Sequence, residues 1–281
     1  QMNIKIQHVI ADITGKSGQE IIKSIIAGER NAEILASCCD SRIRAHKKEG
    51  IIKSLTGVWK EEHVFELEQS YSIYQFYHAK LKECDAKIEE HLREKSGVDT
   101  FVEPQKKEKS NKNNLNFNGK EMLYELTGTD LAEIFGITET NAIEIISEVG
   151  LDMSKWPTVK HFTSWLNLAP NNKISGGKVL SSRIPKKKNH AGQIFRMAAF
   201  AIQRSKNWLA MFYNRIKAKN GAPKAIVATA RKIAAIFYKM IKERVKFNPI
   251  PIEKYMDGFK ENQIKKLKRQ AKNLGLQIVE M

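Results

Sequence analysis

Apolar residues recur every three or four positions along most of this chain, which is the spacing of amphipathic helices rather than strands. Residues 4–30 predict two helices separated by TGKSGQE, with Ser17 and Glu20 forming a capping box at the second one. Residues 31–57 predict two short helices, and residues 59–92 predict a single long helix. Strand signals are few, so the expected fold class is mainly α.

The long helix carries an apolar seam whose members are spaced by threes and fours, as in a coiled coil or a helical hairpin. We expect the seam to drive self-association into a homo-oligomer, or to pack against the first helices. The seam residues are Val64, Leu67, Tyr71, Tyr74, Tyr77, Leu81, Cys84, Ile88 and Leu92.

The helical pattern stops at residues 98–118, which are polar and rich in Asn and Lys. Such a composition is typical of a flexible linker. It predicts a helical, coiled-coil-type region at 1–97 and a second helical domain at 119–281.

The second domain opens with LAEIFGITETNAIEIISEVG. This stretch predicts a helix ending in Gly136, a tight turn, and a second helix from Asn141 to Val149 that Thr138 caps. The pattern resembles a helix-hairpin-helix motif, in which backbone N–H groups at the glycine turn reach a phosphate of DNA. An ordinary helical hairpin with a glycine cap explains it equally well.

Four further helices are expected downstream. The first begins near Pro157 and buries Phe162, Trp165 and Leu166. A long helix covers 191–219, an Ala-rich helix 223–244, and a basic helix 259–274. In the long helix one face would hold Ile194, Met197, Ala198, Ala201 and Ile202, and another face Arg196 and Arg204.

Charge separates the two regions. Lys and Arg outnumber Asp and Glu by 48 to 31, a formal net charge of +17, yet residues 1–97 hold 15 of each sign. Residues 119–281 hold 29 cations against 13 acids, and residues 153–242 hold 19 cations and no acid. Such a surface indicates a polyanionic partner, nucleic acid first. A membrane partner is disfavoured, because no apolar run is long enough to span a bilayer and the aromatic residues are scattered.

Two other kinds of site are not expected. Cys38, Cys39 and Cys84 have no metal-ligand spacing and leave one cysteine unpaired, which fits a reducing cytoplasm. Gly15-Lys16-Ser17 matches the end of a nucleotide-binding P-loop, but the first glycine of that motif is replaced by Ile10.

The candidate chemistry lies in NNKISGGKVLSSRIPKKKNH, residues 171–190. A serine that attacks a phosphodiester needs access, help with deprotonation, and donors for the charge on the phosphoryl oxygens. Ser175 is followed by two glycines whose N–H groups can approach a phosphate. From the residues alone, a phosphate-contacting loop without chemistry is the preferred interpretation, since no acid or His lies between His161 and His190. Ser181 and Ser182 are the alternative nucleophiles. The supporting residues would be Gly176, Gly177 and Lys178, with Lys173, Arg183, Lys186, Lys187, Lys188, Arg196, Arg204 and Gly136 binding nucleic acid.

Four segments carry a family resemblance: HVIADITGKSGQEIIKSIIAGER, LTGVWKEEHVFELEQSYSIYQFYHAKLKECDAKIEEHL, WPTVKHFTSWLNLAPNNKISGGKVLSS and APKAIVATARKIAAIFYKMI. Together they resemble the insertion-sequence one-ten family of transposases, which are DNA recombinases guided by a bridge RNA. The resemblance implies an N-terminal RuvC-like α/β domain with four metal-binding carboxylates, a helical coiled-coil region, and a C-terminal transposase domain with a serine nucleophile before a glycine.

By this resemblance Ser175 is the nucleophile, and the chain matches the C-terminal two-thirds of such a transposase. No residue here corresponds to the RuvC-like carboxylates, so Mg²⁺ is expected only with that domain and no cofactor with this chain. The implied partners are DNA, a bridge-type guide RNA and a second copy, at the nucleoid in the cytoplasm of a bacterium or archaeon. A non-catalytic nucleic-acid-binding fragment and a helical oligomerisation scaffold are the alternatives.

Overall fold

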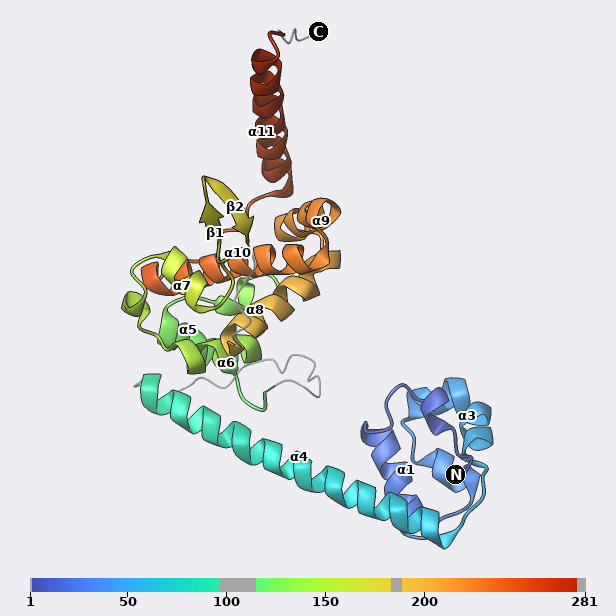
Figure 1. Ribbon diagram of the computed structural model, residues 1–281. Coiled ribbons are helices and arrows are strands. Elements are labelled where there is room, and N and C mark those ends of the chain that lie inside the picture. Colours follow the sequence, from blue (N-terminus) through green and yellow to red (C-terminus); the bar gives the residue numbers. More distant parts are fainter. Residues whose placement is uncertain (1, 97–114, 183–188, 277–281) are drawn as a thin grey trace. The chain divides into compact units, whose positions relative to one another are not determined.

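The computed structural model describes residues 2–96, 115–182 and 189–276, and it confirms the mainly α fold (Figure 1). It divides into two compact units, Gln1–Ala86 and Lys87–Met281. The linker and domain bounds expected around 98–118 stay a prediction, since 97–114 lie outside the described residues. In order the elements are η1 (Ile6–His8), α1 (Lys16–Ile26), α2 (Ala32–Ser37), α3 (Ser41–Leu55), α4 (Glu61–Ser96), α5 (Gly119–Thr127), η2 (Leu131–Glu133), α6 (Glu139–Val149), η3 (Met153–Lys155), α7 (Val159–Trp165), β1 (Lys173–Ser175), β2 (Lys178–Ser181), α8 (His190–Ala201), η4 (Ile202–Arg204), α9 (Trp208–Asn220), α10 (Ala222–Glu243) and α11 (Ile252–Asn273).

The first unit has its own apolar core. Helices α2 and α3 are the two short helices expected within residues 31–57. They begin after Asn31 and Asp40, whose side chains accept hydrogen bonds from the backbone N–H groups of Glu33 and Arg42. The buried residues of this core are Ile6, Ile10, Ile21, Ile25, Leu35, Ala36, Cys39, Ile51 and Leu55.

The prediction for residues 4–30 was wrong in two respects. The first expected helix is only the 3₁₀ turn η1, and it is followed by a turn in which Asp12 Oδ1 accepts from the backbone N–H of Thr14 at 3.0 Å. Such a local side-chain bond competes with helix formation. The expected capping box is also absent, since Gly15 is the N-cap of α1 and Ser17 Oγ instead accepts from the backbone N–H of Asp40 at 2.9 Å.

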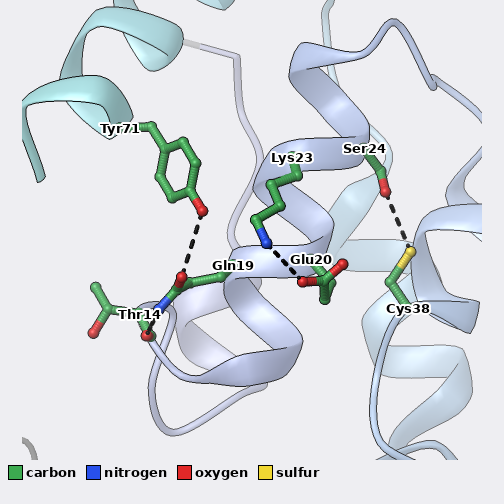
Figure 2. Close-up of polar contacts among 7 residues, drawn as sticks. All are labelled: Thr14, Gln19, Glu20, Lys23, Ser24, Cys38 and Tyr71. Atoms are coloured by element: carbon green, nitrogen blue, oxygen red, sulfur yellow. Dashed lines mark hydrogen bonds and ion pairs between the residues drawn. The ribbon is translucent and has the colours of Figure 1, made fainter. Parts of the chain in front are cut away.

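The start of α4 packs against α1. Figure 2 shows the hydroxyl of Tyr71 donating to Gln19 Oε1 at 3.4 Å, while Gln19 Nε2 donates to the carbonyl of Thr14 at 2.8 Å. Leu67 packs on the first core. In the middle of α4 the seam is uncovered in this single chain, with Tyr77 64% and Leu81 62% exposed, whereas Leu92 near the end of α4 is buried. Packing against the first helices is therefore confirmed for the start of the seam, and a coiled coil stays a prediction for the rest.

The second unit is organised around α10, which packs against α7, α8 and α9. The rings of Trp156 and Phe162 lie 5.1 Å apart, those of Phe162 and Phe195 6.5 Å apart, and those of Phe195 and Phe237 5.4 Å apart. The hydroxyl of Tyr238 donates to the carbonyl of Trp156 at 2.6 Å. This connected aromatic core fixes α7 and α8, which carry the segment of interest between them.

The expected long helix over 191–219 is two helices. Helix α8 ends at Ala201, η4 follows, and α9 begins after Asn207, whose side chain accepts from the backbone N–H of Ala210 at 2.9 Å. The apolar periodicity runs through this break, so it could not reveal the cap.

Three details of the expected faces and bounds were also wrong. Met197 is 60% exposed, and Ala201 is exposed, although Ile194, Ala198 and Ile202 are buried. Phe162 and Leu166 are buried as expected, but Trp165 is 40% exposed. Helix α11 begins at Ile252 rather than at residue 259, directly after Pro251.

Candidate functional site

Ser175 lies in a β-hairpin that the sequence reasoning took for an irregular loop. Strands β1 and β2 are antiparallel, and Ser175 pairs with Lys178 across a two-residue turn. The turn residues Gly176 and Gly177 have φ of 53° and 74°. Two-residue hairpin turns of type I′ require positive φ at both central positions, which favours a Gly-Gly pair. This pair, flanked by Ile174 and Val179, is the signal that could have revealed the hairpin.

The hairpin is open to solvent. All three residues of β1 are exposed, Ile174 by 62%, and Leu180 of β2 is 70% exposed. A Cβ atom added to Gly176 or Gly177 would meet no atom within 4 Å. The backbone at the tip is therefore accessible to a ligand phosphate, and Figure 1 shows the hairpin standing out from the helices of the second unit.

The segment between α7 and α8, which carries the hairpin, is hydrogen-bonded to α8 or α7 at both of its ends. After the hairpin, Asn189 caps α8 by accepting from the backbone N–H of Gly192 at 2.7 Å, and its Nδ2 donates to the carbonyl of Trp165 at 3.3 Å. Before the hairpin, the carbonyl of Asn167 accepts from the guanidinium of Arg196 at 2.7 Å. We call these five residues the α7–α8 clamp. The sequence reasoning missed Asn189, although Asn directly before a helical pattern is an N-cap signal.

The expected nucleic-acid residues lie in different settings. Lys173 and Lys178 are exposed on the hairpin with Ser175, and Arg204 is exposed at the end of η4. Arg196 is half-buried in the clamp, and this burial lowers the pKa of its guanidinium. Arg183, Lys186, Lys187 and Lys188 lie outside the described residues, so their role stays a prediction.

The expected helix before Gly136 is wrong: it is the three-residue 3₁₀ turn η2, capped by Asp130. The second helix is confirmed, with Thr138 and Asn141 forming a capping box. Gly136 has φ of 86°, and a Cβ atom there would lie 2.6 Å from the carbonyl oxygen of Ala198. Close packing of the Gly136 backbone on Ala198 of α8 is thus sufficient to require this glycine. A phosphate contact at Gly136 stays a prediction.

One acid lies at the N-terminus of α8. Glu148 of α6 accepts from the backbone N–H of Ala191 at 2.5 Å and is 3.4 Å from Nδ1 of His190. A carboxylate at this point stabilises the N-terminus of α8. Glu148 already fills the place that an incoming phosphate would take there, so the exposed hairpin tip is the better candidate for a phosphate contact.

Two other kinds of feature are absent from the described ranges. No group of three or more His, Cys, Asp or Glu there could hold a metal ion. None of the helices found in residues 2–96, 115–182 and 189–276 has the length and apolar content to cross a bilayer.

Residues 128–214 match the family model described as Transposase IS116/IS110/IS902 family. The matched segment includes the hairpin, the α7–α8 clamp and Ser175. No curated protein and no solved structure shows significant similarity to the chain. The family match supports a transposase or recombinase role, and with it an interaction with DNA.

Proposed function

We propose that this chain is the strand-transferring part of a DNA recombinase and that Ser175 is its nucleophile. The observation that carries the proposal is the position of Ser175. It directly precedes the Gly176-Gly177 turn of an exposed hairpin, inside the segment that matches the transposase family.

The chemistry is a pair of exchanges at one phosphorus. The hydroxyl oxygen of Ser175 gives up its proton and bonds to the phosphorus of a DNA phosphodiester. The bond from that phosphorus to the leaving sugar oxygen breaks, and this oxygen takes up a proton. The resulting phosphoserine conserves the phosphodiester free energy, so a second sugar hydroxyl can attack it, join the strands and return the serine. Backbone N–H groups at Gly176 and Gly177 and the ammonium of Lys178 are suited to the charge on the phosphoryl oxygens.

The surroundings of the hairpin suit a nucleic-acid duplex. Residues 153–242 contain no acid, so a phosphate backbone that reaches Ser175 meets no repelling carboxylate from this segment. The α7–α8 clamp fixes where the hairpin leaves the helices, which helps to orient the attacking oxygen. A guide RNA in complex with the basic surface, and a second copy recruited through the exposed part of the α4 seam, complete the proposed assembly.

The test joins this chain with a RuvC-like domain from a transposase of the matched family, its guide RNA, and donor and target DNA. A protein–DNA adduct that survives denaturing electrophoresis is expected with Ser175 and not with Ser175→Ala. Ser182→Ala is the matched control and should keep the adduct. DNA affinity of Ser175→Ala should change by less than about tenfold, since one hydroxyl contributes on the order of 1 kcal/mol.

A phosphate-contacting hairpin without chemistry is the second candidate. It is favoured by one observation: within the described parts of the chain, no side chain hydrogen-bonds the hydroxyl of Ser175 to activate it. An adduct that persists in Ser175→Ala and disappears in Ser181→Ala or Ser182→Ala would move the nucleophile. No adduct in any of these proteins would favour the second candidate.

A further inference from the structure

A second cationic site lies where α9, α10 and α11 meet. Cζ of Arg215 is 5.4 Å, 5.7 Å and 4.8 Å from the ring centroids of Phe212, Tyr255 and Phe259. Nζ of Lys232 is 4.8 Å and 5.7 Å from those of Phe212 and Trp208. We call these six residues the aromatic cation cluster. No acid in the described residues forms an ion pair with either cation.

Two further donors in this cluster have no partner. Nε1 of Trp208 and the hydroxyl of Tyr255 are buried without a hydrogen bond, and Trp208 as a whole is only 6% exposed. Their rings are 5.8 Å apart, so both groups belong to the same small region. Buried polar groups are nearly always hydrogen-bonded, and leaving one unpaired costs about 1–3 kcal/mol. Two unpaired donors beside two cations without an acidic partner therefore point to an anionic acceptor.

The positive charges of Arg215 and Lys232 also repel each other. Burial lowers the pKa of Lys232, and the positive charge of Arg215 lowers it further. Both cations lie over the ring of Phe212. A structural role alone would be served better by an acid nearby or by an apolar residue in place of Lys232.

We propose that the aromatic cation cluster binds a phosphate group, and that its source is the backbone of a nucleic acid. Its ammonium, guanidinium and indole groups only donate hydrogen bonds, and the phenol can donate as well. The ligand must therefore be an anion with several acceptor oxygens, for which guanidinium and ammonium groups are well suited. The proposal rests on the nucleic-acid role proposed above. It extends that role to α10 and α11, since Lys232, Tyr255 and Phe259 lie beyond the matched residues 128–214.

The first experiment follows the indole ¹H–¹⁵N resonance of Trp208 in the full chain, assigned with Trp208→Phe. A short single-stranded DNA and inorganic phosphate are added in separate titrations. A shift with DNA alone assigns the site to a polynucleotide backbone. A shift with both probes assigns it to phosphate in general, and the absence of any shift overturns the proposal.

The second experiment measures DNA affinity against salt for Lys232→Met. We expect a roughly tenfold loss of affinity and a fall of about one in the slope of log K against log salt, because one phosphate contact is removed. Lys239→Met on the same helix is the matched control and should change neither, since its ammonium is already 3.7 Å from Glu243. Equal affinities and slopes for wild type and Lys232→Met would overturn the site and leave the role of Ser175 intact.

A stability measurement separates binding from folding. Lys232→Met removes a half-buried, unpaired charge, so its melting temperature should rise by roughly 2–4 °C while DNA binding falls. If it lowers the melting temperature, Trp208→Phe decides, because it keeps a smaller aromatic ring at this position and removes the indole N–H. Unchanged DNA affinity in Trp208→Phe would then overturn the site. If no Ser175–DNA adduct forms but DNA still shifts the Trp208 resonance, the recombinase role is rejected and the phosphate site is retained.

Discussion

Helix α4 and the segment 153–242 differ in whether acidic residues lie next to their Lys and Arg residues. On α4 three of the cations are paired with acids one turn away: Lys80 with Glu83 at 2.8 Å, Lys87 with Glu90, and Arg93 with Glu89 at 2.5 Å. Segment 153–242 contains 19 cations and no acid, although Lys239 pairs with Glu243 just beyond it. A cation that already has a carboxylate partner gains little from a phosphate, whereas an unpaired one gives up only its diffuse counterions. The comparison supports the proposal that nucleic acid binds to the second region.

The apolar faces of the two regions differ as well. Helix α10 buries Ile233, Ala234 and Phe237 among its neighbours. Helix α4 leaves Phe76 and Leu81 exposed by 58% and 62%. The first helix is stabilised within this chain, while the second has an apolar surface suited to a partner.

The largest expected effect concerns salt. If the second region contacts six to ten phosphates, raising salt from about 50 to about 200 mM should lower DNA affinity by roughly 10³–10⁵-fold. Replacing Lys186, Lys187 and Lys188 with Ala should flatten this dependence, as measured by fluorescence anisotropy. The control replaces Lys80, Lys87 and Arg93 with Ala, which should leave the dependence unchanged. If DNA affinity depends equally on salt in both triple variants, the two regions do not differ in their contribution to DNA binding.

The next effect concerns the cores. Phe237→Ala should destabilise the second unit by about 3–5 kcal/mol, because it leaves a cavity beside Phe195. Phe76→Ala, the same substitution on the exposed face of α4, should change stability by less than about 0.5 kcal/mol. Chemical denaturation followed by circular dichroism measures both. A large loss in Phe76→Ala would mean that the α4 face is already covered.

A smaller effect tests the apolar seam of α4 directly, to which Leu81 belongs and Phe76 does not. Leu81→Glu should weaken self-association by at least about tenfold, because an assembled seam would bury the carboxylate. Ala79→Glu introduces the same charge outside the seam and should have little effect. Light scattering over a concentration series distinguishes the two. A wild-type chain that stays monomeric at every concentration would show that the seam does not mediate self-association.

The smallest effect is local. Gly177→Ala meets no neighbouring atom but must hold φ near 74°, at a cost of about 1–2 kcal/mol to the hairpin. We expect faster amide exchange in β1 and β2 and an unchanged melting curve for the helical core. Gly136→Ala is the contrast, since its Cβ would clash with the carbonyl of Ala198 and lower the melting temperature. A lower melting temperature in Gly177→Ala would tie the hairpin to the core.

Much of the helical fold could be predicted because one face of each helix is apolar. The caps at Thr138 and Asp40 follow local side-chain chemistry, but only Thr138 was recognised. The break before Asn207 was missed, since the apolar period continues across it. The exposure of Trp165 and Met197 depends on which neighbours cover a helix, and the spacing of apolar residues carries no such information.

The site was predictable only in part. The candidate site at Ser175 could be found from the serine, glycines and lysines that follow one another in the sequence. The hairpin that presents Ser175 was not recognised. The aromatic cation cluster could not be found at all, because Arg215 and Phe259 come together only through the packing of α9, α10 and α11. Contacts between residues so far apart leave no local pattern.

Because of the α7–α8 clamp, the hairpin segment can be exchanged without changing the helical core. Because Asn189 contacts the carbonyl of Trp165, the chain leaves and re-enters the helical core within the reach of one side chain. A short glycine-rich bridge could therefore replace residues 169–188 without pulling α7 away from α8. A hairpin of different length or sequence could equally be grafted between the same two helices. Natural variation in this segment could then change how the hairpin contacts a DNA strand, while the helical core stays constant.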